Sequence, residues 1–175
     1  MKEELSLYLE SLTNVNPQYV YEGLLSVFCI GFVLLFVFKK KIVWRGITGL
    51  LLIEYIFLIY CSTVFFRIVR EERKFDYTPF WSYDRSDLMA ENIMNVVVFV
   101  PVGLLLGIAF KDIRWWKVLL TGAFISISIE VLQFILKKGF SELDDVMHNT
   151  LGCMIGYWIY ALARYGYERI IRVHG

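Results

Sequence analysis

Residues 126–156 read SISIEVLQFILKKGFSELDDVMHNTLGCMIG, and this pattern predicts two apolar helices joined by a short polar turn. Both helices also contain polar residues that a membrane-spanning helix normally lacks: Glu130, Gln133, Asp145 and Asn149. Placing an ionisable side chain inside a bilayer costs about 3 kcal/mol on insertion scales, so such a residue marks a functional site or a specific partner. The hairpin is therefore the first candidate for a functional site in this chain.

The composition of the chain is typical of a membrane protein. Of its 175 residues, 58% are hydrophobic and 20% are charged, and the mean hydropathy is +0.57. A soluble domain is about half apolar and about a quarter charged, and it does not need apolar runs as long as these. The formal net charge of +1 provides no field that would attract nucleic acid, so a nucleic-acid partner is not expected.

Five apolar runs have lengths close to the roughly 20 residues that a helix needs to cross a bilayer. They cover residues 20–38, 46–66, 93–110, 115–136 and 146–163. Because lipid cannot hydrogen-bond an open backbone, each run is predicted to be a helix. The predicted fold is an all-α polytopic membrane protein with five transmembrane helices and a long loop between the second and the third.

The predicted transmembrane domain covers residues 20–163, between an N-terminal tail (1–19) and a C-terminal tail (164–175). The N-terminal tail lacks the features of a signal peptide, and we expect either a short helix on the membrane surface or a frayed end. Basic residues concentrate in the loops after the first and third spans and in the C-terminal tail: Lys39, Lys40, Lys41, Arg45, Lys111, Arg114, Lys117, Arg164, Arg169 and Arg172. Because Lys and Arg favour the cytoplasmic side, we expect the N-terminus outside and the C-terminus in the cytoplasm.

The polar residues of the hairpin are predicted to share one depth with residues from other spans. Glu130 lies roughly 10 Å from the turn that follows it, at about 1.5 Å of rise per residue. The second span ends at the level of this turn, and the third and fifth spans begin at the same level. The polar residues predicted to gather there are Arg67, Asn95, Glu130, Gln133, Asp145 and Asn149. The neutral members either bind a ligand or join helices by hydrogen bonds, whereas an acid at this depth favours a functional role.

Small residues predict how the last three spans pack. Glycines spaced four residues apart occur in the third and fifth spans: Gly103, Gly107, Gly152 and Gly156. This spacing lets another helix approach closely. We therefore expect the third, fourth and fifth spans to pack tightly, with their polar ends facing one another.

The loop at residues 67–91 is long, and loops of this length usually have a function. Its first part, RIVREERKF, is predicted to be a solvated charged turn or a continuation of the second helix. Its second part, TPFWSYDRSDLMAEN, combines aromatic residues with acids, and aromatic residues favour the membrane interface. This part is expected to lie on the outer surface or to cover the polar cluster as a lid; a simple interfacial tether is the alternative.

Several of these segments together resemble one known family. Residues 92–103, NIMNVVVFVPVG, contain a pattern similar to the N-x-x-x-F-x-P-x-G segment of VanZ-like membrane proteins. The resemblance continues through S-x-x-x-E-x-x-Q at 126–133 and D-D-x-x-x-N-T-L-G-x-x-x-G at 144–156. The sequence T-P-F at 78–80 is similar to the family's I-P-F turn, and Arg67 is similar to its Arg after the second span. The match covers roughly residues 50–160.

One position departs from the family pattern. The family usually has an Arg about six residues before the second Asp, and this chain has Gly139 there. Lys137 or Lys138 is a candidate substitute, but an ammonium is a point charge without the guanidinium fork. The departure argues against bidentate anion binding at this turn.

The resemblance implies a bacterial cell-membrane protein linked to resistance against teicoplanin-type glycopeptides. It also implies a ligand with a lipid tail and a polar head, either an acylated glycopeptide (lipoglycopeptide) or a lipid-linked cell-wall precursor. An outward-facing polar pocket beside aromatic residues suits such a ligand. The residues expected to bind it are Arg67, Asn95, Glu130, Gln133, Asp144, Asp145 and Asn149.

The alternative function is a membrane-embedded enzyme that modifies a lipid-linked envelope substrate, with Glu130 or Asp145 as general acid or base. Against it, the sequence has no Ser-His-Asp set and no metal-ligand spacing, so we expect no catalytic residues, metal or cofactor. Asp144 and His148 are four residues apart and can pair, but they lie about 100° from the stripe formed by Asp145 and Asn149. A transporter is disfavoured because no inverted repeat is visible.

Overall fold

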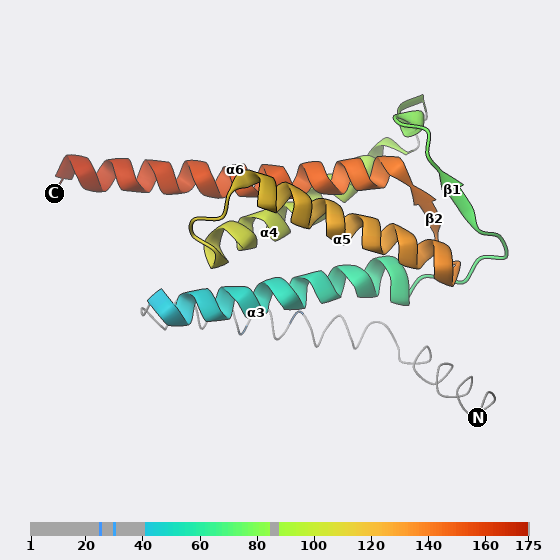
Figure 1. Ribbon diagram of the computed structural model, residues 1–175, viewed down its shortest axis with the longest axis horizontal. Coiled ribbons are helices and arrows are strands. Elements are labelled where there is room, and N and C mark those ends of the chain that lie inside the picture. Colours follow the sequence, from blue (N-terminus) through green and yellow to red (C-terminus); the bar gives the residue numbers. More distant parts are fainter. Residues whose placement is uncertain (1–24, 26–29, 31–40, 85–87, 175) are drawn as a thin grey trace.

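The computed structural model describes residues 41–84 and 88–174, together with the single positions 25 and 30. In this part of the chain, four antiparallel helices lie side by side (Figure 1): α3 (Lys41–Tyr60), α4 (Met89–Ala109), α5 (Trp115–Leu136) and α6 (Leu143–His174). Two short helical turns, η1 (Cys61–Phe65) and η2 (Trp81–Asp84), and two strands, β1 (Lys74–Asp76) and β2 (Phe140–Glu142), complete the fold. We name the end of the bundle that contains β1 and β2 the sheet end, and the opposite end the far end.

Three of the described helices are long and apolar enough to cross a membrane: Trp44–Phe65, Met89–Ala109 and Trp115–Leu136. They correspond to the predicted second, third and fourth spans, so the chain is a polytopic membrane protein. The predicted first span (20–38) and the N-terminal tail lie almost entirely outside the described residues. The predicted fifth span lies within α6, which is not among the three and continues through the predicted C-terminal tail to His174. A total of five spans therefore stays a prediction.

The expectation of an all-α fold was wrong at the sheet end. The strands β1 and β2 pair in parallel, with Lys74 opposite Phe140 and Asp76 opposite Glu142. The segment before β1 crosses the end of α5, where the backbone N–H of Arg70 donates to the Lys137 carbonyl at 2.7 Å. The first part of the loop is therefore solvent-exposed, as one of the two predicted alternatives had it, and it does not continue the helix. Its extended backbone gains hydrogen bonds from a strand far away in the sequence, which local sequence patterns do not reveal.

The helix α3 ends in the wider π turn η1, which leaves backbone carbonyl groups without intrahelical donors. Side chains from the end of α5 and the following turn satisfy two of them. The Gln133 Nε2 donates to the Thr63 carbonyl at 3.0 Å, and the Lys138 Nζ donates to the Phe65 carbonyl at 2.6 Å. These bonds fix the end of α3 against α5, directly before Arg67.

Glycines bring α4 and α6 into backbone contact, as the sequence predicted. A Cβ atom built on Gly103 or Gly156 would overlap a backbone carbonyl oxygen of the opposite helix. A Cβ on Gly152 would overlap the Val96 carbonyl oxygen, and one on Gly107 would overlap a tyrosine ring of α6. The four glycines therefore form the closest helix contact of the described bundle, and the two packed helices are the predicted third and fifth spans.

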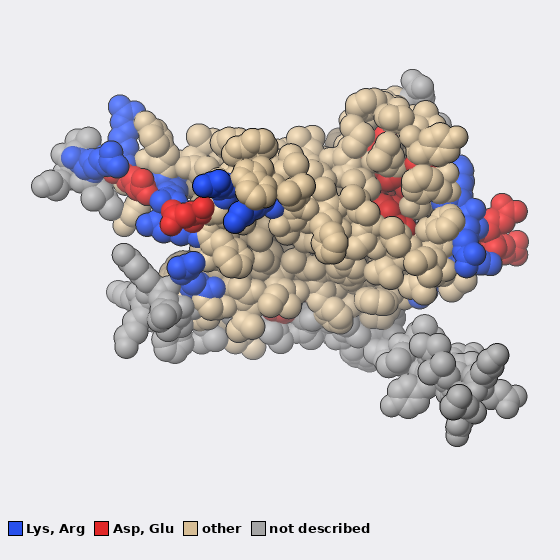
Figure 2. Space-filling model, in the orientation of Figure 1, with Lys and Arg blue, Asp and Glu red and all other residues tan. Residues whose placement is uncertain are grey.

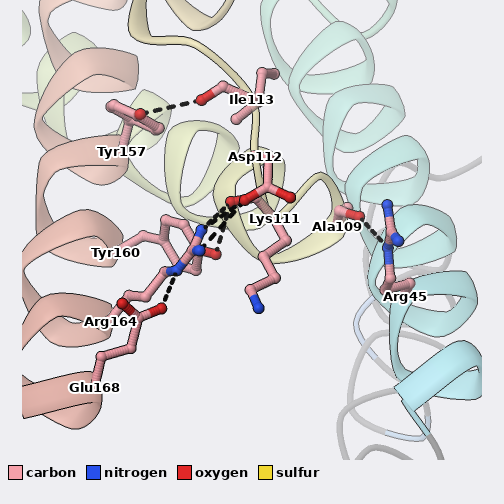
Figure 3. Close-up of polar contacts among 9 residues, drawn as sticks. All are labelled: Arg45, Ala109, Lys111, Asp112, Ile113, Tyr157, Tyr160, Arg164 and Glu168. Atoms are coloured by element: carbon pink, nitrogen blue, oxygen red, sulfur yellow. Dashed lines mark hydrogen bonds and ion pairs between the residues drawn. The ribbon is translucent and has the colours of Figure 1, made fainter.

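Polar contacts close the far end of the bundle (Figure 3). The Arg164 guanidinium donates to the Lys111 carbonyl and lies 3.3 Å from the Asp112 carboxylate, which joins α6 to the loop between α4 and α5. The Arg45 Nε donates to the Ala109 carbonyl at 3.0 Å, which joins α3 to the end of α4. Three of the basic residues assigned to one side of the membrane thus share one end of the bundle. The side that this end faces stays a prediction.

We expect Gly156→Ala to lower the stability of the bundle, because the added methyl group must push the α4 backbone away. Overpacking of this kind costs about 1–3 kcal/mol. The matched control is Gly166→Ala in the same helix, where a Cβ would meet nothing within 4 Å and the helix propensity improves by up to about 1 kcal/mol. Thermal unfolding of the purified protein in nanodiscs should show a lower Tm for the first variant only. Equal Tm values would contradict the backbone contact.

Candidate ligand site at the sheet end

Glu130 is the centre of the site and is held under β2. Its side chain is only 4% exposed, and its Oε2 accepts the backbone N–H of Glu142 at 3.0 Å. The charges that act on it are the carboxylates of Asp145 and Glu142 and the guanidinium of Arg67. A buried carboxylate requires hydrogen bonds, and the amide of β2 supplies one. The strand is therefore positioned by the acid that it covers.

Asp145 and Asn95 connect α6 to α4 at the same level. The Asn95 Nδ2 donates to Asp145 Oδ1 at 2.7 Å. The Arg67 guanidinium and the exposed carboxylate of Glu91 also act on Asp145. Three helices and the segment after η1 thus bring charged groups together at the sheet end. Figure 2 shows acidic atoms recessed among uncharged side chains in this region, next to a basic edge.

Arg67 lies over Gly139, the position at which the chain departs from the family pattern. A Cβ on Gly139 would lie 3.0 Å from a guanidinium nitrogen of Arg67 and 3.1 Å from the side-chain amide of Gln133. Within residues 41–84 and 88–174, this guanidinium makes no hydrogen bond or ion pair. Its fork of five N–H donors therefore stays available to a ligand.

The two lysines of the turn do not take the place of the missing Arg. The Lys138 Nζ donates to the Phe65 carbonyl at 2.6 Å, and the Lys137 Nζ donates to the Glu71 carbonyl at 3.3 Å. Both side chains tie the turn to the segment around η1. A guanidinium nitrogen of Arg67 lies close to Gly139.

The two neutral candidates in α5 and α6 also join helices. Gln133 is 2% exposed and binds the Thr63 carbonyl through its Nε2. Its Oε1 is buried and has no partner among the described residues. The Asn149 Nδ2 donates to Ser126 Oγ at 2.8 Å in the buried contact between α6 and α5. Asn149 therefore contributes to packing below the cluster, whereas Gln133 keeps an acceptor beside Arg67.

Asp144 faces the aromatic part of the loop rather than the cluster around its neighbour Asp145. Its Oδ1 accepts the backbone N–H of Phe80 at 2.6 Å, and its Oδ2 accepts the N–H and the hydroxyl of Ser82 at 3.1 and 2.5 Å. Burial alone would raise the pKa of Asp144, but the hydrogen bonds from Ser82 and Phe80 lower it below the ordinary value of 3.8. The carboxylate therefore stays ionised at neutral pH and holds the loop in place.

The aromatic segment held by Asp144 contains a strained residue. Phe80 follows Pro79 and has a φ of 63°, a left-handed conformation that costs roughly 1–2 kcal/mol for a residue with a side chain. This segment lies beside the N-terminal turns of α4 and α6 (Figure 1). The predicted lid is thus not above Glu130, which β2 covers instead. It covers the neighbouring face between α4 and α6.

Sequence reasoning missed the charged groups that the strands contribute. Burial and the neighbouring carboxylates of Asp145 and Asp76 raise the pKa of Glu142 to about 7, although the positive charge of Lys74 partly opposes this shift. The signal available in the sequence was an acid three residues before Asp145. It was overlooked because the strand pairing that brings β1 to β2 was not expected.

The assembled groups are polar and include both hydrogen-bond donors and acceptors. Among the described residues, no group of three or more His, Cys, Asp or Glu side chains is arranged to hold a metal ion. The site instead combines one guanidinium with several carboxylates and amides. A guanidinium binds carboxylate or phosphate oxygens, while carboxylates accept hydrogen bonds from hydroxyl, amide or ammonium groups.

Comparisons with known proteins match the region that contains this site. A family model described as VanZ/LLP1 matches residues 50–164. Over 126 residues the chain is 31% identical to Protein VanZ of Enterococcus faecium, and this alignment covers 70% of the chain and 76% of that protein. No solved structure matches the chain.

We expect Asp144→Asn to release the aromatic segment, because hydrogen bonds to a charged group contribute about 1.5–3 kcal/mol each. Limited chymotrypsin cleavage at residues 80–83 should become several-fold faster. The control Asp112→Asn removes a carboxylate at the far end that is 84% exposed, and should leave cleavage at these residues unchanged. Because the pKa of Asp144 is lowered, the wild-type contact should persist from neutral pH down to about 4 and be lost as the pH falls further. Unchanged cleavage of Asp144→Asn would show that other contacts hold the segment.

Proposed function

Since this membrane protein belongs to the VanZ/LLP1 family, we propose that it contributes to resistance against teicoplanin-type glycopeptide antibiotics by binding. The ligand is the acylated drug or a lipid-linked cell-wall precursor that the drug would otherwise reach. The binding site is the polar cluster at the sheet end. The protein then acts by occupying or sequestering its ligand, without chemical conversion.

The observation that supports binding is the availability of hydrogen-bonding groups in the cluster. The guanidinium of Arg67 has no partner among the described residues, and the buried Oε1 of Gln133 beside it has none either. A buried polar atom without a partner destabilises a protein by about 1–3 kcal/mol, so a ligand that supplies the missing partner is favoured. The unoccupied donors of Arg67 match an anionic head group, such as a carboxylate or phosphate.

The acids in the cluster suit a holding role better than proton transfer to a substrate. Glu130 accepts a backbone amide of β2, and Asp145 accepts the amide of Asn95. In both cases a polar group of the protein already orients the carboxylate. A catalytic acid or base needs access to the reacting proton at hydrogen-bond distance, and Glu130 is almost completely buried. The enzyme remains the alternative that the experiments below must distinguish.

The position of the cluster also suits a ligand with both a head and a tail. The cluster lies at the ends of α4 and α5, which are apolar enough to cross the membrane. By the distribution of Lys and Arg, this end faces outward. A ligand anchored in the outer leaflet would then present its polar head at the level of Arg67 and its chain along the apolar helices.

We expect Arg67→Gln to remove most of the resistance that the protein gives to a teicoplanin-susceptible bacterium. Loss of a charged hydrogen bond of about 1.5–3 kcal/mol corresponds to binding that is weaker by about tenfold or more. The measurements are the minimal inhibitory concentration of teicoplanin and its Kd for the purified protein in nanodiscs. Arg114→Gln, a change at the far end, is the control and should preserve both values. Full resistance in Arg67→Gln would contradict the proposed site.

Glu130→Gln distinguishes the binding protein from the enzyme, because the amide keeps the shape of the side chain but cannot exchange a proton as an acid. For a binding protein whose ligand is the drug, resistance and drug affinity should fall together. Loss of resistance with full drug affinity would instead favour the enzyme. The thermal stability of the variant is the necessary control, since Glu130 also holds β2.

A further inference from the structure

A second cavity lies on another face of the sheet end, between the N-terminal turns of α4 and α6. Its volume is about 310 Å³, at the lower limit of the ~300–1,000 Å³ typical of ligand pockets. The aromatic segment borders it through Tyr83, and its walls are mostly apolar. We name it the tail pocket; its main lining residues are Tyr83, Met89, Asn92, Ile93, His148 and Leu151.

The polar residues of the tail pocket are paired, with one exception. The Tyr83 hydroxyl lies 2.9 Å from His148 Nε2, and the Asn92 Nδ2 donates to Ser82 Oγ at 3.0 Å. His148 is 6% exposed, and its buried Nδ1 has no partner among the described residues. When the Tyr83 hydroxyl donates to Nε2, Nδ1 bears the ring proton and becomes a donor. Because Nδ1 itself is closed to solvent, the surface that the pocket offers to a ligand is mostly apolar.

Exposed apolar side chains line the tail pocket. Met89, Ile93 and Leu151 line it and are 58%, 55% and 52% exposed. Two of them belong to α4, which is long and apolar enough to cross the membrane. The lining therefore favours an alkyl chain.

The tail pocket and the polar cluster are adjacent in the fold. Asn92 lines the pocket and Asn95, one turn further along α4, binds Asp145 in the cluster. Asp144 fixes Ser82 at the pocket rim, and the next residue, Asp145, belongs to the cluster. One turn of α4 and one turn of α6 therefore contribute residues both to the tail pocket and to the polar cluster.

We propose that the tail pocket takes the acyl chain of an acylated glycopeptide. This inference rests on the proposed function and specifies which part of the ligand each site binds. The chain lies in the tail pocket, and the polar head reaches the cluster around Arg67. An apolar chain accounts for the mostly apolar walls and for the exposed apolar residues at the opening.

The test compares teicoplanin with deacylated teicoplanin on protein in phosphatidylcholine nanodiscs. Ile93→Trp fills the pocket, and Leu151→Trp fills it from α6 in case the first variant does not fold. The matched control is Val97→Trp, four residues further along α4 and 52% exposed but outside the pocket lining. We expect either pocket variant to weaken teicoplanin binding at least tenfold and to leave deacylated teicoplanin unchanged. The control should change neither Kd.

Two results would overturn the inference. If folded Ile93→Trp and Leu151→Trp bind teicoplanin as wild type does, the acyl chain lies elsewhere and the pocket holds only bilayer lipid. If they weaken both forms equally, the pocket does not recognise the chain. In either case, a loss of binding in Arg67→Gln would leave the proposed function standing.

The opposite failure is also distinguishable. If wild-type protein binds neither form of teicoplanin, the proposed drug binding fails, and N-decanoylglycine then tests the pocket alone. Binding of this probe to wild type and its loss in Ile93→Trp would support an acyl-chain site. Equal binding to both proteins, or to neither, would exclude it.

Discussion

The close contact between the backbones of α4 and α6 is the constraint on which the sheet end depends. Gly152 has no Cβ because the Val96 carbonyl occupies that space, and Gly103 and Gly156 repeat the arrangement further along. Apolar side chains gain little from helix association in lipid, so close packing of small residues provides much of the stability. The contact also fixes the rotation of both helices. It thereby places Asn95 against Asp145 and brings Val96 into the wall of the tail pocket.

The two ends of the bundle use polar groups in different ways. At the far end, Arg164 and Arg45 bind backbone carbonyls and a carboxylate, so the helices and the connecting loop are tied together. At the sheet end, several polar groups have no partner among the described residues, including the Arg67 guanidinium, Trp81 Nε1, Gln133 Oε1 and His148 Nδ1. Polar atoms without partners are unfavourable in a stable protein. The proposed ligand site therefore lies at the end where these unpaired groups are found.

Buried acids organise the sheet end because each one holds a different part of the chain. Glu130 binds the backbone of β2, Asp144 binds the aromatic segment, and Asp145 binds α4 through Asn95. A carboxylate in an apolar environment must be hydrogen-bonded, and here the donors come from segments far apart in the sequence. The acids therefore shape the site as well as contributing charge to it.

The sequence by itself predicted the three described helices that are apolar enough to cross a membrane, several polar residues that lie near the sheet end, and the glycines that allow close packing. These properties follow from the length and periodicity of single segments, since a helix advances by a fixed rise per residue. Only the tertiary structure decided that β1 pairs with β2, that Arg67 lies at Gly139, and that Asp144 faces Ser82. The tail pocket could not be predicted from the sequence either, because it forms between helices. Such contacts depend on how each helix is rotated against its neighbours, and packing of the whole bundle sets that rotation.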